Sequence, residues 1–461
     1  MLLLGAIMLA HALQIQVNLH PEFRSSNSRE YSLSLDPGKP MLHYYRLNVL
    51  LPYGEEFDSA NITWGASRDL GKNQIIDFAK DQVPISSGPT AVQTVADPAV
   101  YQVDAFYPSQ DFVYLGTQFY RGYAIALFNV HSIRYNPVQG ELIGFTSFQM
   151  DISTKVNPEL QARQSESVST HQSSLTTLSR FVKNPQDALS YISAPKNRKS
   201  SRNLVPGDAK SMIIITSDSR MDWFADYAAW RESKGISTGI YSTEYIYANY
   251  TGVDNAEKVR NFINDAYLLW LDSSTPLEYV LLGGDDEVVP ERGVFGRVGS
   301  TRDNRMPSDL YFSNLDGNWN ANGNDIYGEM QDDTDMIPEL QIGRFPAESQ
   351  AEFNNIFHKI RHYVDNDTFS NNIAIFYGEN LNNNPLTWGG DYKDDVAQYL
   401  PDEYMYSTQY QRDGTYNSVG VWNSINDGVN VMNHMGHANE VSLLGQGGST
   451  INQLQNTEYG F

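Results

Sequence analysis

The chain has 461 residues, enough for two or three domains with cores of their own. It carries 32 basic and 55 acidic residues, and the resulting formal charge of −23 disfavours nucleic acid and anionic membrane surfaces as partners. Hydrophobic residues make up 41% and aromatic residues 12% of the chain, so we expect most of it to fold. The sequence contains no cysteine, which excludes stabilisation by disulfides.

The first twelve residues predict a secretion signal. An apolar run, LLLGAIMLA, leads to Ala10-His11-Ala12, the small-x-small pattern that a signal peptidase recognises, so we expect cleavage after Ala12. The protein is therefore expected to be secreted and extracellular, with attachment to a cell surface left open. No other segment approaches the roughly 18 apolar residues of a membrane span, and we expect no integral membrane segment. Because an exported acidic protein without disulfides commonly needs another stabilising element, bound Ca²⁺ is the natural candidate.

Residues 13–156 predict an all-β domain. Short alternating runs such as FVYLGTQFYRGYAIALFNVHSIRYNP are separated by Gly, Pro and Asn and show no helical period. Residues 157–210 are rich in Ser, Thr, Gln and Asn. They predict an exposed linker with a short helix around residues 184–193.

Residues 211–461 predict an α/β domain. SMIIITS is typical of a strand buried on both faces, and MDWFADYAAWRESKG follows it with helical spacing. The alternation continues to VNVMNHMGH, which indicates a mostly parallel sheet flanked by helices. Ligand sites in such sheets lie at the carboxyl ends of the strands, where we place His437, Glu379 and the turn Gly283-Gly284-Asp285.

Several motifs in this part resemble, in their order, the gingipain-type cysteine peptidases, relatives of caspases and legumains. They are EYVLLGGDDEVVP, SDLYFSNLDG, PELQIGRFPAES, NIAIFYGEN and GVNVMNHMGHANE. The resemblance implies a caspase-like fold, C-terminally incomplete, of a cysteine endopeptidase made as a zymogen. It further implies protein or peptide substrates, and a β-rich propeptide that acts as the enzyme's own inhibitor.

The resemblance assigns a catalytic role to His437, as general base and acid, because an imidazole takes and returns a proton near neutral pH. Gly436 would permit the tight backbone before it. Glu379 matches the carboxylate that orients the histidine ring, with a solvated strand-end glutamate as the alternative. The family's nucleophile is a cysteine on the next strand. We expect it beyond residue 461, and we expect the 461 residues by themselves to be inactive.

Two further assignments concern specificity and processing. Asp391 lies near the position where arginine-specific members bind the substrate's basic side chain, which implies cleavage after Arg or Lys; a helix N-cap is the alternative. The basic segment KNRKSSR, with Arg198 and Arg202, would then suit self-cleavage of the propeptide.

Calcium ligands are predicted in residues 316–339. The segment NWNANGNDIYGE places Asn318, Asn320, Asn322 and Glu329 at the spacing of a calcium loop. By resemblance, Asp335 and Glu339 match acidic positions that bind calcium in the family. A solvated turn rich in Asn, Asp and Gly is the alternative.

Other histidines favour plainer interpretations. His358 and His362 are four residues apart but lack the glutamate of HExxH, so they indicate a solvated helix face. His434 lies three residues before His437, and strand alternation would point the two to opposite faces, which gives His434 a packing or supporting role. A different class of function also stays open: a non-catalytic, calcium-stabilised surface or adhesion protein that keeps a protease-like fold.

Overall fold

The structure is a computed structural model that describes residues 11–19, 30–81, 94–198, 205–298, 300–332, 334–365, 372–383, 386–439 and 442–447. The chain forms two compact units. Unit 1 comprises Met1–Asp81, Thr94–Arg297 and Arg302–Arg344, and unit 2 comprises Gln82–Gln93, Val298–Thr301 and Phe345–Phe461. None of the described helices is both long and apolar enough to cross a lipid bilayer.

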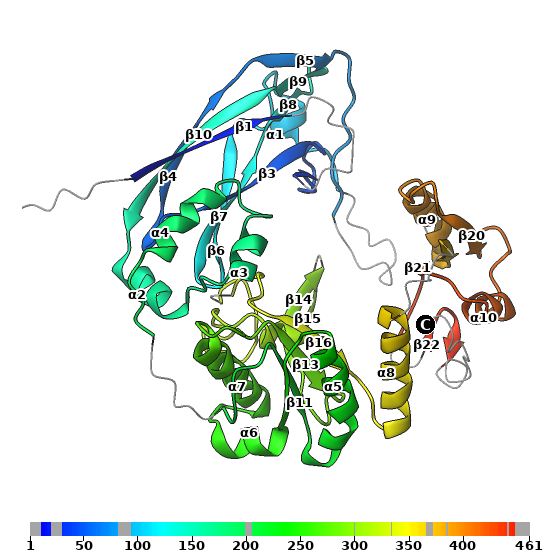
Figure 1. The fold of residues 1–461 in the computed structure, drawn as a ribbon. Helices are drawn as coiled ribbons and strands as arrows, with labels where there is room; N and C mark the ends of the chain where they lie inside the picture. Colours follow the sequence, from blue (N-terminus) through cyan, green and yellow to red (C-terminus); the bar gives the residue numbers. More distant parts are fainter. Residues whose placement is uncertain are drawn as a thin grey trace, which may run out of the picture. The chain divides into compact units, whose positions relative to one another are not determined.

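The N-terminal part of unit 1 is an antiparallel β-sandwich, as predicted (Figure 1). Ile15, Phe128 and Phe148, from strands of the two larger sheets, share one buried core. The three sheets are β1-β10-β4 (His11–Asn18, Ser147–Val156, Glu55–Trp64), β2-β3-β7-β6 (Tyr31–Leu33, His43–Leu50, Tyr123–Val130, Phe112–Tyr120) and β5-β9-β8 (Ser67–Gly71, Glu141–Phe145, Ile133–Asn136), with a short helix α1 (Pro98–Tyr101). Residues 1–10 of the predicted signal lie outside the described residues, and β1 begins at His11.

The prediction of an exposed linker from residue 157 is wrong for most of that segment. It forms α2 (Pro158–Ser167), α3 (Gln172–Leu178), η2 (Pro185–Ala188) and α4 (Leu189–Ile192). Leu178 and Tyr191 are buried against Tyr123 and Ile125 of β7, and the Tyr191 hydroxyl donates to the main-chain oxygen of Leu51 at 2.9 Å. A few apolar side chains in a polar sequence are therefore enough to attach these helices to the sheet. The expected helix at 184–193 is confirmed.

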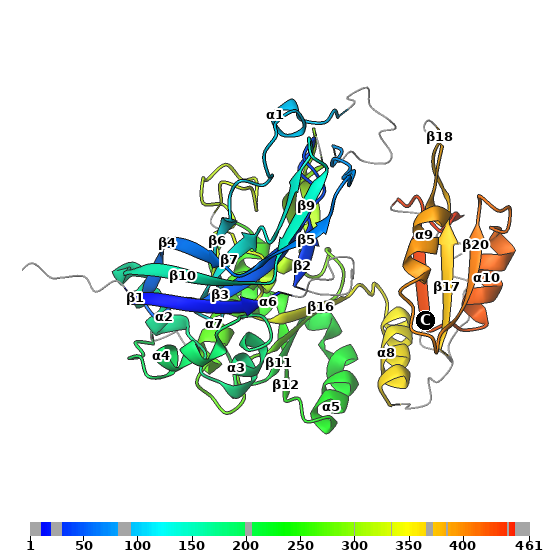
Figure 2. The ribbon, with the colours of Figure 1, turned by 90° about the horizontal axis from the view of Figure 1, so that it is seen from above.

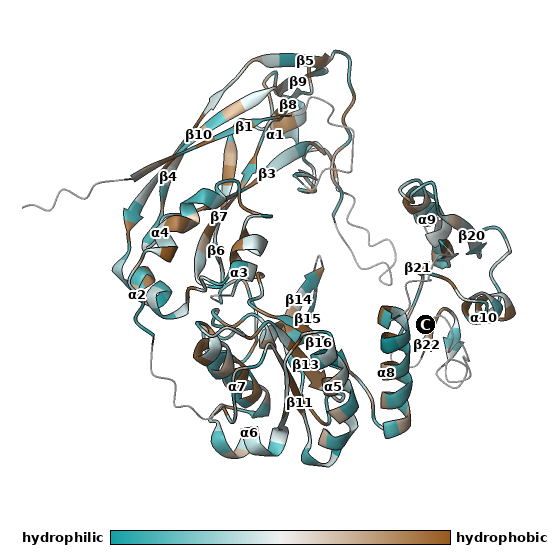
Figure 3. Cartoon of the chain, viewed as in Figure 1, coloured by the Kyte–Doolittle hydropathy of each residue, from teal (hydrophilic) through white to brown (hydrophobic). Residues whose placement is uncertain are grey.

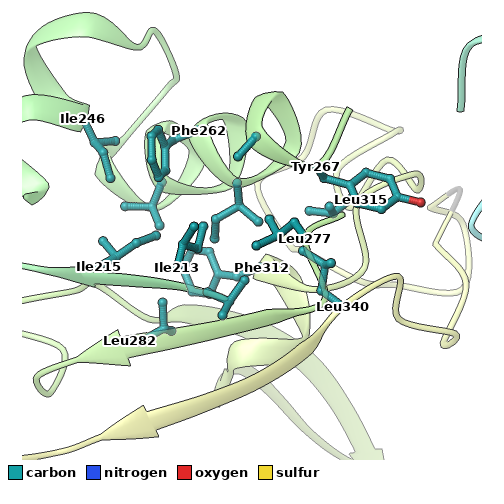
Figure 4. Close-up of a cluster of buried hydrophobic side chains, with 14 of the residues drawn as sticks. Ile213, Ile215, Ile246, Phe262, Tyr267, Leu277, Leu282, Phe312, Leu315 and Leu340 are labelled. Carbon is teal, nitrogen blue, oxygen red and sulfur yellow. The ribbon is translucent and has the colours of Figure 1, made fainter. Parts of the chain in front are cut away.

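Unit 1 also contains a four-stranded sheet in the order β12-β11-β13-β16 (Thr238–Ser242, Met212–Thr216, Tyr279–Gly283, Gln341–Phe345). The central β11 runs parallel to β12 and β13 and is fully buried, as SMIIITS predicts. Ile213 and Ile215 pack against Phe262 of α7 (Asn255–Trp270), as Figure 4 shows. Helix α5 (Ala225–Ser233) lies on the other side of the sheet from α7 (Figure 1).

Shorter elements complete unit 1. They are η3 (Asp218–Phe224), α6 (Thr243–Asn249), η4 (Asp309–Phe312) and the hairpin β14–β15 (Arg292–Val298, Thr301–Ser308). The sheet strands are largely brown and the outer parts of α5 and α6 largely teal in Figure 3. This distribution agrees with an α/β layer whose core lies between the sheet and its helices.

Unit 2 holds a second parallel sheet, β20-β17-β21 (Met405–Tyr410, Ile373–Gly378, Val431–Met435). Val421 and Ile425 of α10 (Ser418–Asn426) pack against Ile375 and Tyr377 of β17. Helix α9 (Gly389–Ala397) contacts β17 and β21, and Figure 2 shows α9 and α10 on opposite sides of β17. The remaining elements are α8 (Gln350–Asp365) and the pairs β18–β19 (Asn380–Asn383, Leu386–Trp388) and β22–β23 (Ser442–Leu443, Gln446–Gly447).

The predicted α/β class is thus confirmed, but in the described part of the chain its strands form two larger sheets and three two-stranded pairs. Gly283-Gly284-Asp285 follows β13 of the first sheet, whereas Glu379 and His437 follow β17 and β21 of the second. The expectation that all three sit on one sheet is wrong, because alternation of strands and helices predicts elements and not their neighbours.

Candidate functional site

Two parallel strands bring the predicted site residues together. Glu379 follows β17 directly, and His437 comes two residues after the end of β21. Because β17 and β21 are parallel neighbours, their carboxyl ends meet at one edge of the sheet. The main-chain N–H of Glu379 donates to the oxygen of Met435 at 2.9 Å, which fixes the two chain ends against each other.

The carboxylate of Glu379 accepts three hydrogen bonds. The Tyr416 hydroxyl donates to Oε1 at 2.9 Å, His434 Nε2 donates to Oε1 at 3.1 Å, and the His437 main-chain N–H donates to Oε2 at 3.0 Å. The side chain is only 8% exposed, so it is not a solvated strand-end glutamate. Burial raises the pKa of Glu379, but these hydrogen bonds outweigh burial and lower it below the usual value. The carboxylate is therefore ionised at neutral pH.

The contact of Glu379 differs from the one expected. Its carboxylate meets the main chain of His437 and the ring of His434, whereas the His437 ring places Nε2 3.0 Å from the main-chain oxygen of Asn380. A carbonyl only accepts, so Nε2 of His437 carries the hydrogen and Nδ1 keeps its lone pair. The Asn380 carbonyl thus orients the ring, a role that the sequence had given to Glu379.

Gly436 is required by the close packing around this carboxylate. A Cβ on Gly436 would lie 2.2 Å from Nε2 of His434 and 2.5 Å from Cδ of Glu379. The chain leaves the strand after Met435 and bends at Gly436, so strand alternation no longer applies to His437. The ring of His434 and the main-chain N–H of His437 thereby reach the same carboxylate.

The start of α9 closes the other side of the site. The main-chain N–H of Gly389 donates to the oxygen of Glu379 at 2.7 Å, and a Cβ on Gly389 would lie 2.2 Å from the oxygen of Met435. Sequence reasoning missed both Gly389 and Tyr416. The Gly389-Gly390 pair ahead of a helix is the signal that could have indicated close packing there.

Asp391 is already paired with a residue of the same unit. Arg412 donates through Nη1 to Asp391 and, at 2.9 Å, to Asp394, and through Nε to Asp413 at 2.8 Å. Asp391 lies in the first turn of α9, whose N-cap is Trp388, so the N-cap alternative is wrong. Asp391, the expected substrate-binding carboxylate, is therefore already paired with the guanidinium of Arg412.

The side chain of Arg198 is held in place as well. Its Nε and Nη2 each donate to Asp272 at 2.7 Å, and Nη1 and Nη2 donate to the main-chain oxygens of Glu166 and Val168 at 2.7 and 2.8 Å. An arginine with these bonds is not available to a protease pocket unless they break. Arg202, the second predicted processing residue, lies outside the described residues.

The side chains of the predicted calcium loop hydrogen-bond one another. The amide groups of Asn322 and Asn324 donate to the carboxylate of Glu329 at 3.1 and 2.6 Å, and the amide of Asn320 donates to Asp325 at 3.2 Å. Three amide groups of this loop thus donate to its carboxylates. Asn318 Oδ1 accepts from the main-chain N–H of Asn320 at 3.1 Å, as in an ordinary polar turn.

Asp335 and Glu339 are buried and bind main-chain N–H groups. Asp335 accepts from Phe119 at 2.7 Å, and Glu339 accepts from Leu315 at 2.8 Å and from Arg121 at 3.3 Å. Within the residues that the structure describes, no three His, Asp or Glu side chains are arranged to hold a metal ion. The hydrogen bonds of these two acids thus connect Phe119 and Arg121 to residues near β16.

Asp316 is a third buried acid in the same region. Its Oδ1 is buried without a hydrogen-bond partner, and burial together with the charge of Asp335 raises its pKa to about 7. Burial and the charge of Asp316 also raise the pKa of Glu339. His358 and His362, by contrast, stack at 6.1 Å on one face of α8, as expected.

A comparison with models of protein families identifies the family of the chain. The sequence model of peptidase family C25 matches residues 206–461. The chain belongs to this family. The resemblance to gingipain-type cysteine peptidases is thus confirmed. A comparison with curated proteins found no match.

Solved structures of proteases share similarity with part of the chain. A structure described as that of a protease has 19% identity and a TM-score of 0.42, covering 55% of this chain and 51% of its own. The Arg-specific cysteine proteinase gingipain R has 19% identity and a TM-score of 0.39, covering 55% and 53%. The complex of the RgpB pro- and mature domains from Porphyromonas gingivalis has 19% identity and a TM-score of 0.37, covering 53% and 52%. The chain thus spans about half the length of these structures.

Replacing Gly436 with alanine should disrupt the site, because the added Cβ would overlap His434 and Glu379. We expect a loss of about 1–3 kcal/mol in the stability of unit 2, measured by urea denaturation. Gly447→Ala is the matched control, since a Cβ there has no atom within 4 Å. Equal stability of the two variants would contradict the packing described.

Proposed function

We propose that this chain belongs to an endopeptidase in which His437 transfers protons for a cysteine thiolate. The nucleophile is not among the 461 residues, which contain no cysteine. The observation that carries the proposal is the exposed ring of His437 at the carboxyl ends of β17 and β21, with Nε2 held by the Asn380 carbonyl. This geometry leaves Nδ1 as the base.

The chemistry assigns a defined task to that nitrogen. Nδ1 takes the thiol proton, the thiolate attacks the scissile carbonyl carbon, and the imidazolium then gives the proton to the departing amine. Water subsequently hydrolyses the acyl-enzyme, with the same nitrogen as the base. Glu379 supports this cycle by holding the main chain of His437 at 3.0 Å.

Replacing His437 with alanine should lower kcat by about 10² to 10⁴, the usual span for a general acid-base group. The measurement is turnover of a fluorogenic peptide by a protein that includes the nucleophile. His358→Ala, on the exposed face of α8, is the control and should retain activity. Normal turnover by His437→Ala would exclude the proposal, whereas no turnover by the unaltered protein would favour a non-catalytic surface or adhesion protein.

The position of the nucleophile has its own test. Reading the gene past the codon for Phe461 shows whether a cysteine codon follows in a strand-forming segment. A reading frame that closes without a cysteine would contradict this proposal whatever the outcome of the kinetic comparison.

We further propose a preference for Arg or Lys before the scissile bond, with Asp391 as the residue that recognises it. The pairing of Arg412 with Asp391 supports this, because it shows that these carboxylates accommodate a guanidinium. The same pairing means that a substrate side chain must compete with Arg412 for this carboxylate.

In a fluorogenic peptide library, Asp391→Asn should lower kcat/KM for Arg substrates by about tenfold or more, as a hydrogen bond to a charged group is lost. Asp395→Asn, an exposed neighbour on α9, should leave it unchanged. An enzyme without any preference for Arg or Lys would show that Asp391 is misassigned.

Zymogen formation is proposed from the contacts within unit 1. The end of β6 and the turn that follows it dock on Asp335 and Glu339 through the N–H groups of Phe119 and Arg121. Arg121 Nε also donates to the main-chain oxygen of Glu339 at 2.8 Å. These bonds tie the β-rich domain to the α/β part, as a propeptide that stays in place requires. Export of the protein stays a prediction from the sequence.

We also propose that Ca²⁺ stabilises the segment 316–339, at the unpaired oxygen of Asp316. Excess EGTA should then lower the melting temperature, since a bound ion at 100 times its Kd contributes about 2.7 kcal/mol. Asp316→Asn should lose the response to Ca²⁺, and Asp325→Asn, in the exposed loop, should keep it. Identical melting curves with and without EGTA would refute the proposal.

A further inference from the structure

His434 is a half-buried residue of β21 for which the sequence predicts a packing or supporting role without indicating what it supports. It pairs with Tyr377 in the register of β17 and β21, and its side chain is 17% exposed. Its Nε2 lies 3.1 Å from Oε1 of Glu379. Because the ionised carboxylate can only accept, Nε2 of His434 carries the hydrogen.

His434 and Tyr416 together satisfy one oxygen of a buried charge. Both donate to Oε1 of Glu379, while Oε2 receives the N–H of His437. A buried carboxylate that loses a donor binds a proton or turns toward water. Either change weakens the charge-assisted hydrogen bond that the His437 main-chain N–H donates to Oε2.

That bond is one of two anchors on His437. The main-chain N–H is held by Glu379, and the ring is held by the Asn380 oxygen. Gly436 precedes His437 and provides little restriction of the backbone by itself. The direction of the His437 ring therefore depends on both of these hydrogen bonds. Because Glu379 makes one of them, it also depends on the N–H that His434 donates to Glu379.

We propose that His434 is a positioning residue for His437, acting through the carboxylate of Glu379, with Tyr416 as the second donor on the same oxygen. This inference rests on the proposed proton transfer by His437, but the contacts that support it do not require turnover. The interaction is directional: it needs a hydrogen-bond donor at the position of Nε2, and an apolar side chain of similar size does not replace it.

The test uses the full chain labelled with ¹⁵N at histidine. Long-range ¹H–¹⁵N correlation spectra report which ring nitrogen carries hydrogen, and hydrogen exchange reports the protection of the His437 N–H. In the unaltered chain we expect the Nε2–H tautomer for both His434 and His437. In His434→Leu, exchange at the His437 N–H should be about tenfold faster or more, and its ring should lose the Nε2–H preference.

Rescue separates a donor from a packing residue. His434→Gln presents a side-chain amide that can reach the same oxygen, and it should restore both the protection and the tautomer. Tyr416→Phe removes the other donor and should change His437 in the same direction, which keeps the test valid should His434→Leu fail to fold. His358→Leu, on α8, is the control and should have no effect.

Two results would overturn the inference. One is an unchanged His437 signal in both His434→Leu and Tyr416→Phe; the other is a changed signal in His434→Leu that His434→Gln does not restore. The proposed function fails separately, if His437→Ala turns over normally while these spectral changes occur.

Discussion

A buried negative charge at the end of β17 is the constraint on which the candidate site depends. The Glu379 side chain is 8% exposed, and it stays ionised only because three donors face it. The donors come from β21, from the residue after its bend, and from the loop before α10. These segments must therefore be folded together before the ring of His437 has a defined direction. The site is a product of the whole second sheet and not of one motif.

Unit 1 depends on buried acidic side chains. Asp335 and Glu339 accept hydrogen bonds from N–H groups at the end of β6 and in the turn that follows, where Arg121 and Gly122 have φ values of 49° and 83°. A Cβ on Gly122 would lie 2.6 Å from Cα of Val168, so this turn also packs closely against the end of α2. Without the β-rich domain, the two carboxylates would lose these donors while still facing each other's charge. The domain is thus a structural part of unit 1.

The parts of the fold that the sequence predicts well are those with a strong local signal. The run around Ile213 and Ile215 predicts a strand buried on both faces, and it is one. The helices after residue 157 were missed because their attachment rests on a few side chains, such as Leu178 and Tyr191, in a polar sequence. The division into two sheets was missed as well, because periodicity describes one strand at a time and carries no information on its partner.

The site shows the same limit at the level of atoms. The rule for parallel strands placed Glu379 and His437 at one edge, but the bend at Gly436 decided which atoms meet.

A histidine ring that is oriented by a carbonyl suits a thiol nucleophile better than a serine hydroxyl. A thiol has an ordinary pKa of about 8.5, close enough to that of an imidazole for direct proton transfer. The resulting thiolate itself stabilises the imidazolium, so a neutral carbonyl, that of Asn380, is sufficient to orient the ring. A serine, which is far less acidic, depends on a carboxylate behind the histidine. The carbonyl contact therefore agrees, on chemical grounds, with the cysteine nucleophile of the family.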